Sequence, residues 1–294
     1  MISFVGAGPG AADLLTLRGR DRLATADVVV WASSLVPAEV LSHARPEAEL
    51  HDSAAMTLED VLEVYRDRPS ASIVRLHSGD PCLFGAVQEQ VDWCLANGRD
   101  FEIVPGVSSL GAAAAALGRE LTVPHLAQAV VVTRLAGRTA ASMPPGQSVA
   151  DLAPVGATMA VFLSAARPGP LQAELLAGGA GYSPDTPAAV VVRASRPDQQ
   201  VVLTTVGRVA EDLAATGART TALVLVGPAL AGAAPRSHLY SPSFAHSFRR
   251  RSAPGTTAGR AALRSGTEPA SRSGTEPAFR SGTEPAFRSG TEPA

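Results

Sequence analysis

The sequence predicts a two-domain α/β protein in which each domain has a mostly parallel or mixed sheet flanked by helices. Short runs rich in β-branched residues alternate with amphipathic or Ala-rich stretches over residues 1–230. This alternation is typical of layered α/β folds with mostly parallel strands. The chain has 294 residues, of which 46% are hydrophobic, and this is enough for two domains with sizeable cores.

Nine segments have the composition of strands. They cover residues 2–5, 27–31, 72–76, 101–104, 129–133, 157–163, 188–193, 200–205 and 221–226. The later half holds more of these segments per residue than the first half, so we expect its sheet to be mixed.

Helical patterns lie between the early strands, over residues 14–24, 57–66, 84–97 and 112–117. Thr57 and Asp60 have the spacing of a capped helix start, and Gly98 suits the position just after a helix end. Residues 121–124 are a candidate hinge. We therefore expect an N-terminal domain over 1–120 and a C-terminal domain over 121–231.

The C-terminal segment has a different character. The sequence Ser-Gly-Thr-Glu-Pro-Ala occurs four times, at 265–270, 273–278, 281–286 and 289–294. A period of eight with a proline in each repeat suits neither a helix nor a packed repeat array. This composition predicts a disordered low-complexity tail over 232–294.

Composition excludes several functional classes. All 25 basic residues are Arg, so Schiff-base catalysis by lysine and a P-loop lysine are ruled out. Residues 1–230 carry 16 Arg against 23 Asp and Glu, and this acidic balance argues against a nucleic-acid partner. Apolar runs are too short for a membrane span, and two cysteines cannot form a disulfide framework. We expect a cytoplasmic protein without a signal peptide.

Gly6-Ala7-Gly8-Pro9-Gly10 follows the first predicted strand and precedes a helix, where open α/β sheets present ligand-binding loops. A dinucleotide fingerprint is one interpretation. Pro9 removes an N–H that would face a pyrophosphate, and the second strand lacks a following acid for the ribose. A nucleotide-like ligand and a simple tight turn both remain possible for this loop.

Two further strand-to-helix turns reach the same edge of the predicted sheet. In His77-Ser78-Gly79-Asp80-Pro81, the glycine allows close backbone approach, and Asp80 either binds a ligand or caps a helix. The third turn, Val104-Pro105-Gly106-Val107-Ser108-Ser109, ends in two hydroxyls, one of which is accounted for by helix capping. Three such turns in one domain indicate a shared ligand site.

Together, these motifs resemble the tetrapyrrole (corrin/porphyrin) methyltransferase family over residues 1–230. Within it, the chain is most similar to the subgroup that methylates C11 of precorrin-4. The stretches that carry this second likeness are Ser34-Leu35-Val36-Pro37, Leu76-His77-Ser78-Gly79-Asp80, Val132-Thr133-Arg134-Leu135-Ala136-Gly137-Arg138-Thr139 and Arg193-Ala194-Ser195-Arg196-Pro197-Asp198-Gln199. Many relatives have Asp directly after Gly-Pro-Gly, whereas Ala11 stands here.

The resemblance implies a homodimer with an active cleft between its two domains. It implies that S-adenosylmethionine is the methyl donor and that a tetrapyrrole intermediate of cobalamin biosynthesis is the acceptor. Mapped onto this sequence, the donor contacts are Pro9, Ser78, Gly79, Asp80, Ser108, Ser109, Leu163 and Ala194. The acceptor carries several carboxylates, and Arg134, Arg138, Arg167 and Arg193 are the candidates to bind them.

No catalytic residue is assigned firmly; Asp80 and His77 are the candidates, and a structural role is the simpler interpretation of His77. The sequence shows no cluster with metal-ligand spacing, so we expect no metal. Alternatives within the family are methylation at C17, C20 or the uroporphyrinogen C2/C7 positions. A nicotinamide or flavin oxidoreductase, a methyltransferase acting on RNA or protein, and a non-catalytic binding protein are more distant alternatives.

Overall fold

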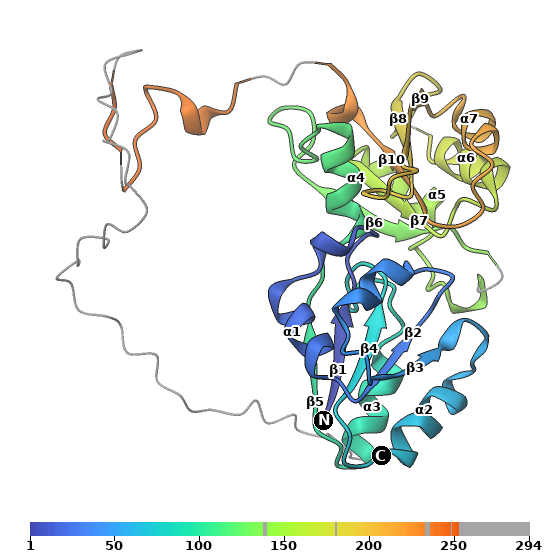
Figure 1. The fold of residues 1–294 in the computed structure, drawn as a ribbon. Helices are drawn as coiled ribbons and strands as arrows, with labels where there is room; N and C mark the ends of the chain where they lie inside the picture. The colour runs from blue at the N-terminus through green and yellow to red at the C-terminus, as the bar shows by residue number, and fades with distance from the viewer. Residues whose placement is uncertain (138–139, 180, 233–235, 248, 253–294) are drawn as a thin grey trace, which may run out of the picture. The chain divides into compact units, whose positions relative to one another are not determined.

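The computed structural model describes residues 1–137, 140–179, 181–232, 236–247 and 249–252 (Figure 1). The chain divides into two compact units, Met1–Ser237 and His238–Ala294. In the second unit, the described residues contain a short 3-10 helix at His238–Tyr240 and a bridge between His246 and Arg249. The four repeats lie outside the described residues, so the disordered tail stays a prediction. All that follows concerns the first unit.

The first sheet is entirely parallel, with the strand order β3-β2-β4-β1-β5. Its strands are β1 Ile2–Gly6, β2 Val28–Trp31, β3 Glu49–Asp52, β4 Ile73–His77 and β5 Phe101–Val104. Because β1 lies between β4 and β5, the three glycine-containing turns that follow these strands emerge at one edge, side by side.

Helices cover both faces of the first sheet. They are α1 Leu17–Thr25, α2 Leu58–Asp67 and α3 Gln88–Ala96. Alternate strand residues point to opposite faces, so Phe4 packs with residues of α2 and α3, whereas Val5 packs with Leu23 of α1. Thr57 and Asp60 form the expected capping box at the start of α2.

The second sheet is mixed, with the order β6-β7-β10-β8-β9. Its strands are β6 Val130–Arg134, β7 Thr158–Phe162, β8 Pro187–Val192, β9 Gln200–Thr205 and β10 Ala222–Val226. β6 and β7 are parallel, and the other neighbouring pairs are antiparallel. The expected mixed sheet is confirmed, and so is the α/β fold class.

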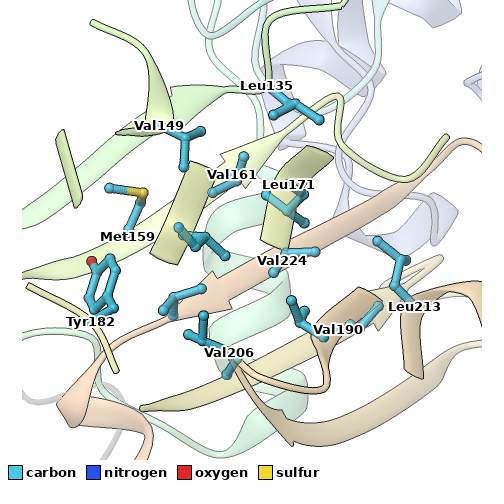
Figure 2. Close-up of a cluster of buried hydrophobic side chains, with 14 of the residues drawn as sticks. Leu135, Val149, Met159, Val161, Leu171, Tyr182, Val190, Val206, Leu213 and Val224 are labelled. Atoms are coloured by element: carbon cyan, nitrogen blue, oxygen red, sulfur yellow. The ribbon is translucent and has the colours of Figure 1, made fainter. Parts of the chain in front are cut away.

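One face of the second sheet carries α5 Val149–Leu152, α6 Pro168–Ala177 and α7 Val209–Ala215. Figure 2 shows the core between them, with Met159, Val161, Val190 and Val224 of the strands meeting Leu171 of α6 and Leu213 of α7. The other face packs against α4 Ser109–Leu117, whose Ala113 is fully buried. In Figure 1, each sheet therefore forms a layer with helices on both of its faces.

Short 3-10 helices complete the first unit. They are η1 Ala12–Leu14, η2 Ala38–His43, η3 Ser53–Ala55, η4 Ala140–Ser142, η5 Ala153–Val155 and η6 Pro228–Leu230.

The helix predicted over 84–97 requires a correction. α3 begins only at Gln88, because Phe84 and Ala86 have left-handed backbone conformations, with φ of 55° and 49°, that do not continue a right-handed helix. At the other end, Gly98 has φ of 59°, which agrees with the predicted position just after the helix.

Candidate functional site

The three predicted turns meet at the carboxyl edge of the first sheet and are bonded to one another. The N–H of Ala7 donates to the carbonyl of His77 at 2.8 Å. Gly8 and Gly79 exchange two backbone hydrogen bonds, of 3.2 and 2.8 Å. The first and second turns thus stay paired beyond the end of the sheet, through an antiparallel bridge between Gly8 and Gly79.

Glycine is required where the turns touch. A Cβ atom added to Gly6 would lie 2.5 Å from the Cα of Gly106, and one added to Gly106 would lie 2.7 Å from the Cα of Gly6 and closer still to the carbonyl oxygen of Gly79. Carbon atoms in ordinary contact are about 3.5–4.0 Å apart. Gly6 and Gly106 therefore allow the backbones of the three turns to approach more closely than any side chain permits, and Gly79 adopts a left-handed φ of 67°.

Asp80 joins the second turn to the third. Its Oδ1 accepts the N–H of Cys82 and its Oδ2 accepts the N–H of Gly106, both at 2.8 Å. Asp80 does not cap α3, which starts eight residues later. Instead, its carboxylate satisfies two backbone donors at the site and holds the two turns in register.

In the third turn the two hydroxyls have different positions. The Oγ of Ser108 accepts the N–H of Leu110 at 3.2 Å and caps α4. Ser109 is the first residue of that helix. The expectation that one of the two serines is a cap is confirmed for Ser108.

A cavity of about 310 Å³ opens beside these turns. Its wall on the side of the first sheet contains Pro9, Leu35, Ser78, Gly79, Asp80, Leu83, Phe84, Ser108 and Ser109. The second sheet and its loops add Phe162, Leu163, Ala165, Ala166, Val191, Arg193, Ala194, Arg196 and 219–223. All eight residues predicted to contact the methyl donor lie in this wall.

The arginines predicted to bind the carboxylates of the acceptor do not all lie at the cavity. Arg193 lines the cavity, and its Nε lies 2.9 Å from Asp198 Oδ2. Arg134 donates to Ser142 Oγ at 3.0 Å and Arg167 donates to the carbonyl of Ala136 at 2.7 Å; neither lines the cavity. Arg138 lies outside the described residues. Sequence reasoning missed Arg219 as a cavity residue and singled out Arg196 only as part of a motif.

His77 lies in the core behind the second turn. It is 5% exposed, and its ring Nε2 has no hydrogen-bond partner among the described residues. Burial, with repulsion from Arg75, lowers the pKa of His77 to about 4, against a smaller opposing effect of a hydrogen bond with the Gly85 backbone. The ring is therefore neutral at neutral pH and does not line the cavity.

The loop between β8 and β9 connects the second sheet to the first turn. The Oγ of Ser195 accepts the N–H of Ala11 at 3.0 Å, and Nη2 of Arg196 donates to the carbonyl of Leu35 at 2.6 Å. A Cβ on Gly10 would meet the Arg196 side chain at 2.6 Å. Ala11 therefore contributes its backbone to this contact.

Left-handed backbone conformations gather at the cavity. Phe84, Leu163, Arg193 and Thr221 all line it, with φ between 49° and 55°. Each such non-glycine residue costs about 1–3 kcal/mol, and clusters of them are typical of ligand sites. The wall is thus a strained arrangement that the surrounding packing maintains.

In the part of the chain that the structure describes, no helix has the length and apolar character needed to cross a bilayer. No group of three or more His, Cys, Asp or Glu side chains is placed there to hold a metal ion.

The chain belongs to the tetrapyrrole (corrin/porphyrin) methylases, whose family model matches residues 1–210. The resemblance drawn from the sequence motifs is therefore confirmed. Among curated relatives, the cobalt-precorrin-4 C(11)-methyltransferase of Methanocaldococcus jannaschii is 40% identical over 255 residues, which cover 85% of this chain and 96% of the relative. The precorrin-4 C(11)-methyltransferase of Rhodococcus erythropolis is 43% identical over 243 residues, or 82% and 96% of the two chains.

Solved structures show the same likeness. A cobalt precorrin-4 methyltransferase, CbiF, matches with a TM-score of 0.74 and 41% identity, covering 79% of this chain and 96% of that one. A uroporphyrin-III C-methyltransferase from Thermus thermophilus, complexed with S-adenosylhomocysteine, matches with a TM-score of 0.65 and 31% identity, covering 78% and 98%.

Proposed function

We propose that this protein transfers the methyl group of S-adenosylmethionine to C11 of precorrin-4 in cobalamin biosynthesis. One observation carries the proposal: Pro9, Ser78, Gly79, Asp80, Ser108, Ser109, Leu163 and Ala194 lie around a single cavity. They come from three turns of the first sheet and two strand ends of the second. The relatives named for this reaction, at 40% and 43% identity, give it independent support.

The cavity suits the donor. Its volume of about 310 Å³ lies at the lower end of the roughly 300–1,000 Å³ common for small-molecule sites. Gly79 and the small hydroxyl residues Ser78, Ser108 and Ser109 line it, so backbone groups lie within reach of a ligand. We propose that the eight residues above hold the donor there. When bound, S-adenosylmethionine supplies a methyl group already activated by a sulfonium charge.

The residues of the chain contribute to the reaction by positioning the donor and the acceptor. Methyl transfer needs the acceptor carbon in line with the donor methyl, and holding two reactants in this way contributes up to ~7–11 kcal/mol. Asp80 and the close contact of Gly6 with Gly106 hold the turns together, and Arg193 presents a guanidinium to the carboxylates of the acceptor. We propose Arg134 and Arg167 as more distant contacts of the same acceptor.

Two measurements test the proposed activity. Calorimetric titration with S-adenosylhomocysteine should show micromolar binding, whereas NADH, as a control, should show none. Absence of binding by S-adenosylhomocysteine, or equal binding of NADH, would count against the proposal. Methyl transfer should then be assayed with metal-free and cobalt-containing precorrin-4, because relatives are named for each form.

We further propose a homodimer in the cytoplasm. The edge strand β9 exposes two apolar side chains, Leu203 at 74% and Val201 at 39%, and an exposed apolar edge strand tends to pair with another surface. Both Cys82 and Cys94 are free, in keeping with a reducing compartment. Light scattering should give the mass of a dimer, and Leu203→Glu should shift it toward the monomer. A monomeric parent protein would refute the dimer.

A further inference from the structure

Two phenylalanine rings from different sheets meet in the cavity wall. Phe84 belongs to the segment between β4 and α3, and Phe162 ends β7. Their ring centroids are 5.0 Å apart and the planes are tilted by 44°. Both residues line the cavity, and Phe84 is 45% exposed. The pair is not among the contacts that the sequence motifs suggest.

Phe84 has two unfavourable features, an exposed apolar side chain and a left-handed backbone conformation. A large apolar side chain is ordinarily buried, and a φ of 55° is costly for a residue with a Cβ atom. The next residue, Gly85, folds back so closely on Pro81 that a Cβ would lie 2.9 Å from the Pro81 carbonyl carbon. The Gly85 backbone also affects the buried His77, whose pKa it raises against the larger effect of burial. This support keeps the ring directed at the cavity.

The charged side chains of the cavity wall are mostly positive, so an aromatic contact is an important source of attraction for a cation. Arg193, Arg196 and Arg219 line the cavity, whereas Asp80 is the one carboxylate among the described wall residues. Both oxygens of Asp80 accept backbone N–H groups. A cation in this cavity therefore shares it with three guanidinium groups and with a carboxylate already engaged in hydrogen bonds.

An aromatic face attracts a cation that lies within about 6 Å of the ring centroid. Since the two centroids are 5.0 Å apart, one positive atom can satisfy this distance to both rings.

We propose that Phe84 and Phe162 form the binding site for the sulfonium group of S-adenosylmethionine. This inference deepens the proposed function and rests on it. The rings favour the charged sulfur of the donor over the neutral sulfur of S-adenosylhomocysteine. Transfer of the methyl group removes the charge, so the product loses this attraction and the pair promotes its release.

The test compares two ligands that differ in one methyl group and one charge. Dissociation constants of S-adenosylmethionine and S-adenosylhomocysteine are measured by calorimetry, without acceptor, for the parent chain and the variants Phe84→Leu, Phe162→Leu and Phe84→Tyr. Each leucine variant should weaken binding of the donor by about 3- to 30-fold, the range expected for a cation–π contact, and change product binding less than about 2-fold. The tyrosine variant should retain the parent ratio.

Leu83→Ala is the matched control, because Leu83 is an apolar wall residue without a ring. It should change both dissociation constants by the same factor. Equal weakening of both ligands in the leucine variants would overturn the inference, since contact with the adenosyl part would then explain the result. If Phe84→Leu fails to fold, Phe162→Leu decides. If the parent binds neither ligand, the proposed function itself has failed.

Discussion

Replacing Gly106 by alanine tests the packing of the three turns. The added Cβ would lie 2.7 Å from the Cα of Gly6 and closer to the carbonyl oxygen of Gly79. Reaching an ordinary carbon–carbon contact requires a shift of about 1 Å, and both neighbours are backbone, so no change of rotamer relieves the clash. Overpacking of this kind costs about 1–3 kcal/mol, and we expect the upper end.

The shift also separates the N–H of Gly106 from Asp80, whose Oδ2 accepts it at 2.8 Å. A displacement of 1 Å at a site that aligns two reactants lowers turnover by about 100-fold. Gly111→Ala is the matched control, because Gly111 lies in α4 with open space around its Cβ position. That change should stabilise the protein by about 0.5–1 kcal/mol.

Urea unfolding of the two variants measures the free energies, and calorimetry with S-adenosylmethionine measures binding. The two substitutions, five residues apart, should move stability in opposite directions. The packing argument would be refuted if Gly106→Ala had the unfolding midpoint and donor affinity of the parent chain.

Three further predictions concern single side chains. His77 has a folded-state pKa of about 4 against about 6.5 when unfolded, so the stability gained from its neutral form is complete above pH 6.5 and is lost as pH falls toward 4. The pH-dependent part of the unfolding free energy is about 3 kcal/mol. His77→Gln should reduce the difference in unfolding free energy between pH 7 and 4.5. An unchanged difference would contradict this. Ser108→Ala should lower the unfolding free energy by about 1 kcal/mol through loss of the α4 cap, whereas Ser109→Ala leaves the cap in place; equal losses would contradict the assignment. Arg193→Ala should raise KM for the tetrapyrrole more than for the donor, and more than Arg134→Ala does; the reverse order would remove Arg193 from the acceptor site.

Most of the fold could be predicted because the strands are encoded locally. The nine predicted strands are all present, with ends displaced by at most one residue. β3 was missed, since Glu49–Asp52 is a charged, largely exposed edge strand without an apolar pattern. Short helices of the second half, such as α5, carry too few residues for a clear period. Their positions are set by packing against the second sheet.

The candidate site was predictable where it depends on turns that follow strands, and unpredictable where it depends on contacts between distant segments. Gly6, Gly79 and Gly106 are visible in the sequence as glycines after strands. The approach of Phe84 to Phe162, and of Arg196 to Leu35, joins residues 78 and 161 positions apart. Likewise, α4 precedes the boundary expected at residues 120 and 121 but packs on the second sheet.

The most direct test of the central claim is the fate of a labelled methyl group. The purified chain is incubated with precorrin-4 and S-adenosylmethionine labelled with carbon-13 in the methyl group, and the product is examined by NMR. The proposed function predicts a single labelled methyl attached to C11 and an equal amount of S-adenosylhomocysteine. A labelled methyl on C17, C20 or another ring carbon, or no transfer to metal-free and cobalt-containing precorrin-4 alike, would contradict it.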